Sequence, residues 1–162
     1  MKIKKILYGA YGNNMNIDEM KVRCKNATVY GQGYIKNYEL NFNEYATIVA
    51  SKDKLVPVVL WLISDEDKKR LDVYEGVKQG IYRKEILPVK VTKIVENNRL
   101  IDISNGEVEV IALIYIMTEK YVLKFANKVP NEEYFKSILE GYRKNGIETS
   151  SLGIALLEMK LE

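Results

Sequence analysis

Glu75 is the residue of this chain that is best placed to act as an acid or a base. It ends a predicted helix over residues 65–75 and falls on the apolar face of that helix. Partial burial, the negative end of the helix dipole and the nearby Asp72 would each raise the pKa of its carboxyl group. A carboxylate base that works near neutral pH needs such a shift. The alternative is an ordinary salt bridge from Glu75 to Arg83 or Lys84.

The loop Tyr11-Gly12-Asn13-Asn14 is the second candidate. It follows a predicted strand over residues 3–11 and precedes a helix that Asn16 would cap. Free backbone N–H groups at such a junction, helped by the helix dipole, can hold an anion or a developing oxyanion. The simpler alternative is a strand-to-helix turn that binds no ligand.

The residue types that are missing narrow the chemistry further. The chain has 162 residues, no histidine and one cysteine, Cys24. Without an imidazole, a Ser-His-Asp or Cys-His nucleophile and a His-bearing zinc or iron site are excluded. Cys24 is better explained as a small buried side chain than as a nucleophile. We therefore expect carboxylate acid–base chemistry, with no metal and no organic cofactor.

Tyrosine is the dominant aromatic residue, with 12 copies against three Phe and one Trp. A phenol can bury its ring and still present its hydroxyl to a polar pocket. Most of these rings are expected to pack in the core or at its rim, and Trp61 is expected in the core. Seven tyrosines lie in or beside predicted elements: Tyr8, Tyr11, Tyr30, Tyr74, Tyr82, Tyr115 and Tyr134.

The overall composition is that of a globular domain in water, with 47% hydrophobic and 29% charged residues. The net charge is +3 and the basic residues are interspersed with acidic ones, so we expect no nucleic-acid partner. The apolar run at 56–63 is too short to cross a membrane, and residues 1–7 do not lead into the apolar core of a signal peptide. We expect a single domain over residues 1–162, located in the cytoplasm, with no membrane partner.

The elements that must position these residues alternate irregularly along the chain. This order predicts an α+β domain with a small closed or strongly curved, barrel-like mixed sheet, flanked by two or three helices. The domain core is expected over residues 3–152, with a tail at 153–162 that packs on the domain or forms a homodimer contact. Segment 119–129 is a candidate lid. The other predicted elements are strands within 28–63, a helix over 65–75 capped by Ser64, strands at 82–95 and 108–117, and a helix over 131–145.

An ordered set of short motifs resembles the gamma-glutamylcyclotransferase family of the AIG2-like superfamily. Residues 8–15, Tyr-Gly-Ala-Tyr-Gly-Asn-Asn-Met, are similar to the family's Tyr-x-Ala-Tyr-Gly-Ser-Asn-Met/Leu loop. The matches keep their order and spacing from Leu7 to about Leu152. The further motifs are Arg23-Cys24, Ala27, Ala46-Thr47-Ile48, Val58-Val59-Leu60-Trp61, Leu71-Asp72-x-Tyr74-Glu75-Gly76-Val77, Gly80-x-Tyr82, Tyr115-x-Met117, Pro130, Tyr134, Ile138 and Gly141.

The resemblance implies a compact barrel-like α+β fold and an intramolecular amide cyclisation, of transferase or lyase type, that releases 5-oxoproline. The family's catalytic glutamate falls on Glu75, and its substrate-contacting tyrosine falls on Tyr134. The chain departs from the family at Gly9, where Phe is common, and at Asn13, where Ser is common. The family's substrate-binding loop falls on Tyr8, Gly9, Ala10, Tyr11, Gly12 and Asn13.

The substrate implied by the resemblance is a small γ-glutamyl amine or peptide, as in glutathione metabolism. Two other reactions fit the same site, namely the cyclisation of a γ-glutamyl-ε-lysine and the removal of a γ-glutamyl protecting group in a biosynthetic pathway. A non-catalytic module that binds a small ligand on the same fold is the alternative from another class.

Overall fold

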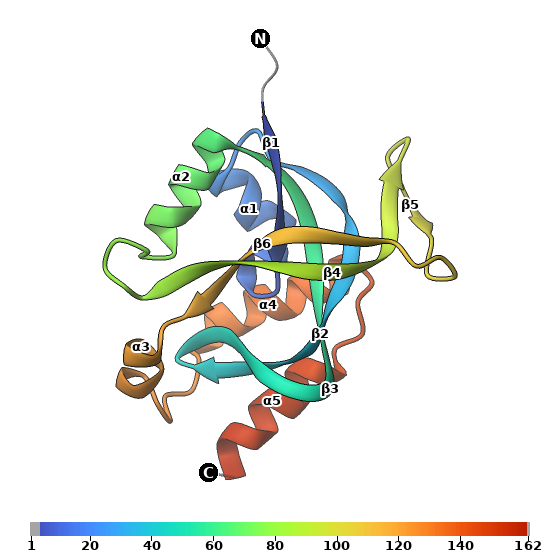
Figure 1. Ribbon diagram of the computed structural model, residues 1–162. Helices are drawn as coiled ribbons and strands as arrows, with labels where there is room; N and C mark the ends of the chain where they lie inside the picture. Colours follow the sequence, from blue (N-terminus) through green and yellow to red (C-terminus); the bar gives the residue numbers. More distant parts are fainter. Residues whose placement is uncertain (1–3, 162) are drawn as a thin grey trace.

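A strongly curved mixed sheet of six strands forms the centre of the molecule, as the computed structural model shows for residues 4–161 (Figure 1). The strand order is β2-β3-β1-β6-β4-β5, and β2 also pairs with β4, so five of the strands close into a barrel. The predicted α+β class and closed sheet are confirmed. The strands are β1 (Lys5–Ala10), β2 (Thr28–Asn43), β3 (Tyr45–Ser64), β4 (Tyr82–Glu96), β5 (Arg99–Asp102) and β6 (Glu109–Met117).

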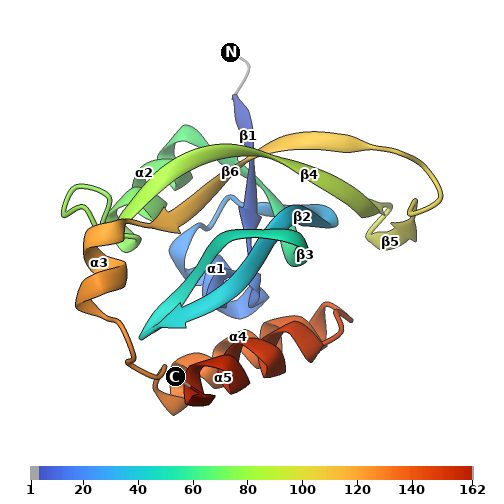
Figure 2. The ribbon, with the colours of Figure 1, turned by 60° about the horizontal axis from the view of Figure 1, so that its bottom comes forward.

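Helices cover the barrel on several sides. Helices α4 and α5 both lie beneath the ribbon formed by β2 and β3 (Figure 2). Within the part of the chain that the structure describes there are five α-helices and one 3-10 turn, more than the two or three helices predicted. They are η1 (Asn13–Met15), α1 (Ile17–Arg23), α2 (Asp65–Tyr74), α3 (Glu119–Lys124), α4 (Glu132–Lys144) and α5 (Ser150–Leu161).

The helix boundaries that matter for the site follow the predicted caps. The Asn16 side chain accepts hydrogen bonds from the backbone N–H groups of Asp18 and Glu19, at 3.1 and 3.2 Å. The Ser64 hydroxyl accepts one from the Asp67 N–H at 3.1 Å and so begins α2. Helix α2 ends at Tyr74 with Glu75 as its C-cap, and the next residue, Gly76, has a positive φ of 63° that glycine adopts without strain. These caps fix the two chain segments that carry the candidate loop and Glu75.

Tertiary structure joins and extends several of the predicted elements. The separate strands expected within residues 28–63 are the two long strands of one hairpin, β2 and β3. Strand β5 and helix α3 were not predicted because they are short and bury no complete side chain. The expected strand start at Ile3 lies outside the described residues.

The segment predicted as a tail is part of a helix. Helix α5 begins at Ser150, so the boundary expected after residue 152 falls inside it. Leu152 and Ala155 are almost fully buried, whereas Ile154 and Leu157 are exposed. The helix therefore packs one face on the domain, and a homodimer contact through its other face stays a prediction. None of the described helices has the length and hydropathy needed to span a bilayer.

Candidate active site

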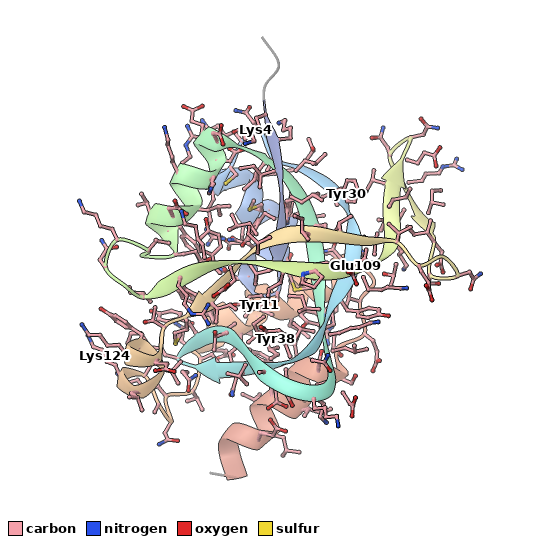
Figure 3. The ribbon with its side chains drawn as sticks, in the orientation of Figure 1. Lys4, Tyr11, Tyr30, Tyr38, Glu109 and Lys124 are labelled. Atoms are coloured by element: carbon pink, nitrogen blue, oxygen red, sulfur yellow. The ribbon has the colours of Figure 1, made fainter. Side chains whose placement is uncertain are left out.

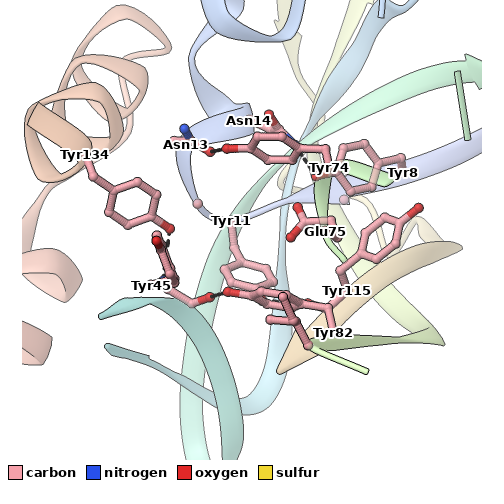
Figure 4. A pocket seen from close by; sticks show the side chains of 14 residues that line it. Tyr8, Tyr11, Asn13, Asn14, Tyr45, Tyr74, Glu75, Tyr82, Tyr115 and Tyr134 are labelled. Atoms are coloured by element: carbon pink, nitrogen blue, oxygen red, sulfur yellow. Dashed lines mark hydrogen bonds between the residues drawn. The ribbon is translucent and has the colours of Figure 1, made fainter. Parts of the chain in front are cut away.

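A cavity of about 290 Å³ opens where β1, the end of α2 and the start of α4 converge (Figure 4). Its wall is mostly aromatic, and Glu75 is the one acidic or basic residue among those that line it. The lining residues are Tyr8, Gly9, Tyr11, Gly12, Asn13, Asn14, Tyr45, Ala46, Tyr74, Glu75, Ile81, Tyr82, Tyr115 and Tyr134.

The cavity brings together most of the residues singled out in the sequence. Glu75, Tyr134 and the loop residues Tyr8, Gly9, Tyr11, Gly12 and Asn13 all line it. Ala10 does not, because its methyl group is buried in the hydrophobic core with 1% of its surface exposed. A direct contact between the Ala10 side chain and a ligand is therefore not expected.

Sequence reasoning missed the far wall of the cavity. Tyr45 and Ala46 start β3, at the tip of the long hairpin that bends over the pocket. Ile81, which directly precedes β4, also lines the cavity. Ala46 was singled out only as part of the Ala46-Thr47-Ile48 motif, and Tyr45 and Ile81 carry no local signal. The places of all three depend on how distant segments meet at the cavity.

Glu75 lies at the centre of a ring of tyrosines (Figure 4). Its backbone N–H still donates to the carbonyl of Leu71 at 2.8 Å, so the last turn of α2 fixes the side chain. Burial raises the pKa of the carboxyl group to about 7, against a smaller lowering by the positive charge of Arg23. A carboxyl group with this pKa exchanges protons readily near neutral pH.

The neighbours of Glu75 differ from expectation in two respects. Asp72 binds the ammonium group of Lys84 at 2.9 Å and accepts a hydrogen bond from the Tyr115 hydroxyl at 2.7 Å, and it is not a cause of the raised Glu75 pKa. Arg83 pairs with Glu85. The alternative of a salt bridge from Glu75 to Arg83 or Lys84 is thus wrong, and Glu75 forms no ion pair within residues 4–161.

The hydroxyl groups of the pocket tyrosines are held by backbone and side-chain partners. The Tyr82 hydroxyl donates to the Ala46 carbonyl at 2.5 Å, and the Tyr134 hydroxyl accepts from the Ala46 N–H at 2.9 Å. The Tyr11 hydroxyl donates to the Tyr115 carbonyl at 2.5 Å. Burial raises the pKa of each of the three phenols Tyr11, Tyr82 and Tyr134 above its ordinary value. They are therefore neutral near pH 7 and form a fixed wall.

The candidate loop presents donors to this cavity. Residues 13–15 form a 3-10 turn, in which the N–H groups of Met15 and Asn16 bond back to Gly12 and Asn13. Among the described residues, the N–H groups of Gly12 and Asn13 find no acceptor within the protein. Two amide donors thus remain available beside the pocket, as an oxyanion or a carboxylate requires.

Helix α4 is fastened to the loop, and this fixes Tyr134. The Asn16 side-chain amide donates to the Ser137 carbonyl at 3.1 Å, and the Asn145 amide donates to the Met15 carbonyl at 2.9 Å. A Cβ atom on Gly12 would lie 3.8 Å from the Tyr134 hydroxyl, so the two groups are neighbours. The loop and Tyr134 therefore form one rigid side of the cavity.

The candidate lid, residues 119–129, packs beside the cavity and does not line it. Phe125 meets the Tyr45 ring edge to face at 5.8 Å between centroids, and the Lys128 carbonyl accepts from the Glu44 N–H at 2.7 Å. Lys124 of the same segment points outward, whereas Tyr11 lies within the curve of the sheet (Figure 3). The segment supports the hairpin tip that carries Tyr45.

No group of three or more Cys, Asp or Glu side chains that could hold a metal is found within residues 4–161.

Known proteins share this architecture. The model of the AIG2-like family matches residues 55–151. Gamma-glutamylcyclotransferases from Bos taurus and Homo sapiens are each 26% identical over 153 residues, which span 87% of this chain and 72% of theirs. A solved gamma-glutamyl cyclotransferase superposes with a TM-score of 0.73 at 22% identity, over 97% of this chain and 87% of that one. An AIG2-like protein from Mus musculus superposes with a TM-score of 0.55 at 16% identity, over 80% and 87% of the two chains. Because the family model covers more than half of its residues, this chain belongs to the AIG2-like family.

Proposed function

We propose that this protein converts a γ-glutamyl amine or peptide into 5-oxoproline and a free amine. The observation that carries the proposal is Glu75, a carboxyl group with a pKa of about 7 in an aromatic cavity. The same cavity is lined by Gly12 and Asn13, whose backbone N–H groups have no acceptor among the described residues. The names of the similar bovine and human proteins support the same reaction class. We further propose that the reaction needs no metal and no organic cofactor.

Glu75 would move one proton in each half of the reaction. As a carboxylate it takes a proton from the substrate's α-ammonium group, and the freed nitrogen attacks the γ-carbonyl carbon. The five-membered ring closes through a tetrahedral intermediate. The Glu75 carboxylic acid then gives its proton to the leaving nitrogen as the C–N bond breaks, and the ring nitrogen loses its second proton to water. A single group can do both because its pKa of about 7 leaves both protonation states accessible.

The loop and the tyrosines would position the substrate. The N–H groups of Gly12 and Asn13 are the donors for the oxyanion of the intermediate. The Tyr134 hydroxyl accepts from the backbone, so its own proton is free for the glutamyl group. The Tyr11 hydroxyl already donates to the Tyr115 carbonyl, so Tyr11 contributes its ring rather than a hydrogen-bond donor.

The direct test is incubation of the protein with a panel of γ-glutamyl compounds, with 5-oxoproline as the readout. The panel includes γ-glutamyl dipeptides, glutathione, γ-glutamyl-ε-lysine and simple γ-glutamyl alkylamides. Release of 5-oxoproline from at least one compound supports the proposal, and the pattern identifies the class of amine. Binding without release from any compound would favour a non-catalytic ligand-binding module.

The pH dependence of the reaction gives a second prediction. Because the free enzyme needs Glu75 as a carboxylate, kcat/KM should fall as the pH drops through about 7, tenfold per pH unit on the acid side. This fall is the acid limb of the pH profile, and an ordinary glutamate would place it near pH 4. The measurement is kcat/KM between pH 5 and 9 on the best substrate of the panel, and a profile that is flat down to pH 5 would contradict the role of Glu75.

Replacement of Tyr134 tests the binding wall. Tyr134→Phe removes the hydroxyl that faces the glutamyl group and leaves the Ala46 N–H without its acceptor. We expect KM to rise by about tenfold and kcat to fall less, since the hydroxyl binds the substrate in the ground and transition states alike. Tyr38→Phe is the matched control, because Tyr38 lies on β2 and does not line the cavity. A fall confined to kcat would instead assign proton transfer to Tyr134.

A further inference from the structure

Arg23 lies behind the wall of the candidate active site and contacts two of its residues. It is the last residue of α1, and only 18% of its side-chain surface is exposed. One guanidinium nitrogen donates to the Asn14 side-chain oxygen at 2.5 Å, and the guanidinium carbon stacks 3.9 Å from the centre of the Tyr74 ring. The other terminal nitrogen bonds Glu19 at 3.2 Å. Arg23 does not line the cavity, so any effect on the reaction must pass through its neighbours.

The contact with Arg23 fixes which way the Asn14 amide faces. Asn14 is 3% exposed, and its main-chain carbonyl accepts from the Trp61 indole at 3.1 Å. A guanidinium can only donate, so the Asn14 atom beside it must be the oxygen. The amide nitrogen then points the other way and donates to the Tyr8 hydroxyl at 3.0 Å. Without Arg23, nothing in the described part of the chain would hold the Asn14 oxygen in place at that side, and the amide could turn over.

The chain of bonds determines what the Tyr8 hydroxyl can do. Because its oxygen accepts from Asn14, its proton must go to another acceptor. Within the described residues, the Tyr8 hydroxyl donates to no protein atom, and Tyr8 lines the cavity together with Glu75. Burial, and then the charge of Glu75, raise the pKa of the Tyr8 phenol well above its usual value, so the proton stays on the oxygen.

We propose that Arg23 is a positioning residue that acts through Asn14 to keep Tyr8 as a hydrogen-bond donor to the γ-glutamyl substrate. The proposal rests on the proposed function for the identity of the acceptor, but not for the Arg23–Asn14–Tyr8 chain itself. A carbonyl or carboxylate oxygen of the bound glutamyl group is the acceptor that the Tyr8 proton fits. Arg23 thus determines, from outside the cavity, that the Tyr8 hydroxyl donates a hydrogen bond into it.

The positive charge of Arg23 has a second effect on the same site. It favours the carboxylate form of Glu75 and so holds the pKa of this group lower than burial alone would. The phenols that also face Glu75 from the surrounding elements are neutral near pH 7: Tyr8, Tyr11, Tyr74, Tyr82, Tyr115 and Tyr134. Removal of the guanidinium should therefore raise the Glu75 pKa and move the acid limb of kcat/KM to higher pH.

A double-mutant cycle with Tyr8 separates positioning from general structural support. At a pH well above the acid limb, where the shift in the Glu75 pKa no longer matters, Arg23→Gln should lower kcat/KM by about tenfold in the wild-type background. In the Tyr8→Phe background, which lacks the hydroxyl that Asn14 orients, the same substitution should lower it by less than about twofold. Arg23→Lys keeps the charge but not the planar donor, so the acid limb should stay in place while much of the rate loss remains. Glu19→Gln is the control, since it removes the other partner of Arg23 and leaves Asn14 in contact.

The outcomes are distinguishable from a failure of the proposed function. Equal losses from Arg23→Gln in both backgrounds, or no loss in either, would overturn the positioning role. If wild-type protein releases no 5-oxoproline from any compound, the proposed function fails. The Arg23–Asn14–Tyr8 chain is then tested by the NMR signals of the Asn14 side-chain NH₂. These signals should change in Arg23→Gln and Arg23→Lys and stay the same in Glu19→Gln. Unchanged Asn14 signals in both Arg23 variants would refute it.

Discussion

Glu75→Gln should lower kcat at least about 100-fold, because a positioned general acid–base group contributes about 10²- to 10⁴-fold to such reactions. The amide has nearly the shape of the carboxyl group, so the cavity and the end of α2 should be preserved. Binding of the γ-glutamyl substrate should change little, since we propose that the loop and Tyr134, which line the same cavity, make the glutamyl contacts. The measurement is steady-state release of 5-oxoproline, together with substrate binding by calorimetry.

Stability provides an internal check on this variant. The Glu75 pKa is higher in the folded protein than in the unfolded chain, so this group stabilises the fold at low pH and costs stability as the pH rises through about 7. Glu75→Gln removes the buried charge and should raise the melting temperature at pH 8 relative to wild type. Glu66→Gln on the exposed face of α2 is the matched control, expected to leave turnover unchanged. Near-normal 5-oxoproline release by Glu75→Gln would refute the assignment of the base.

The sequence predicted those parts of the site that depend on local signals. Asn16 and Ser64 cap helices because their side chains accept bonds from backbone N–H groups, and Gly76 lies just past the end of α2, where a positive φ is needed. Each of these signals acts within a few residues. The position of Glu75 at the helix end and of the loop before α1 therefore followed from the sequence without knowledge of the fold.

The remaining features depend on contacts between distant segments. Tyr45 and Ala46 reach the cavity only because the β2–β3 hairpin bends over the barrel. Asp72 was expected to add its negative charge to the site, but Lys84 of the facing strand β4 binds it instead. The salt bridge considered for Glu75 failed for the same reason, since Lys84 was already engaged. Such pairings are settled by strand register, which periodicity in a single sequence does not show.

The shape of the cavity depends in turn on the closure of the barrel. Strand β2 pairs with β3 along one edge and with β4 along the other, and the β2–β4 pairing runs from Gly31 to Tyr34 with a bulge between Gln32 and Gly33. Since β3 carries Tyr45 and Ala46 and β4 carries Tyr82, the β2–β4 seam connects two walls of the pocket. A change that opens this seam should affect both stability and the site.

Gly31→Ala should strongly destabilise the sheet. An added Cβ atom would lie 2.1 Å from the Lys93 carbonyl oxygen and 3.1 Å from the Ile94 Cα atom. Both are backbone atoms of the paired strand, so no side chain can turn aside and β2 must separate from β4. We expect the free energy of unfolding to fall by about 3 kcal/mol, the upper end for overpacking by one methyl group.

The matched control for this substitution is Gly153→Ala in α5, where a Cβ atom would meet nothing within 4 Å. Replacing a glycine inside a helix by alanine should stabilise the protein by about 0.5–1 kcal/mol. Urea unfolding of both variants measures the difference, and 5-oxoproline release below the transition reports on the pocket. Equal midpoints for the two variants would show that the seam tolerates a side chain and that barrel closure is looser than the β2–β4 contacts imply. A large loss of stability confined to Gly31→Ala would show instead that close backbone contact between β2 and β4 holds the two walls of the cavity together.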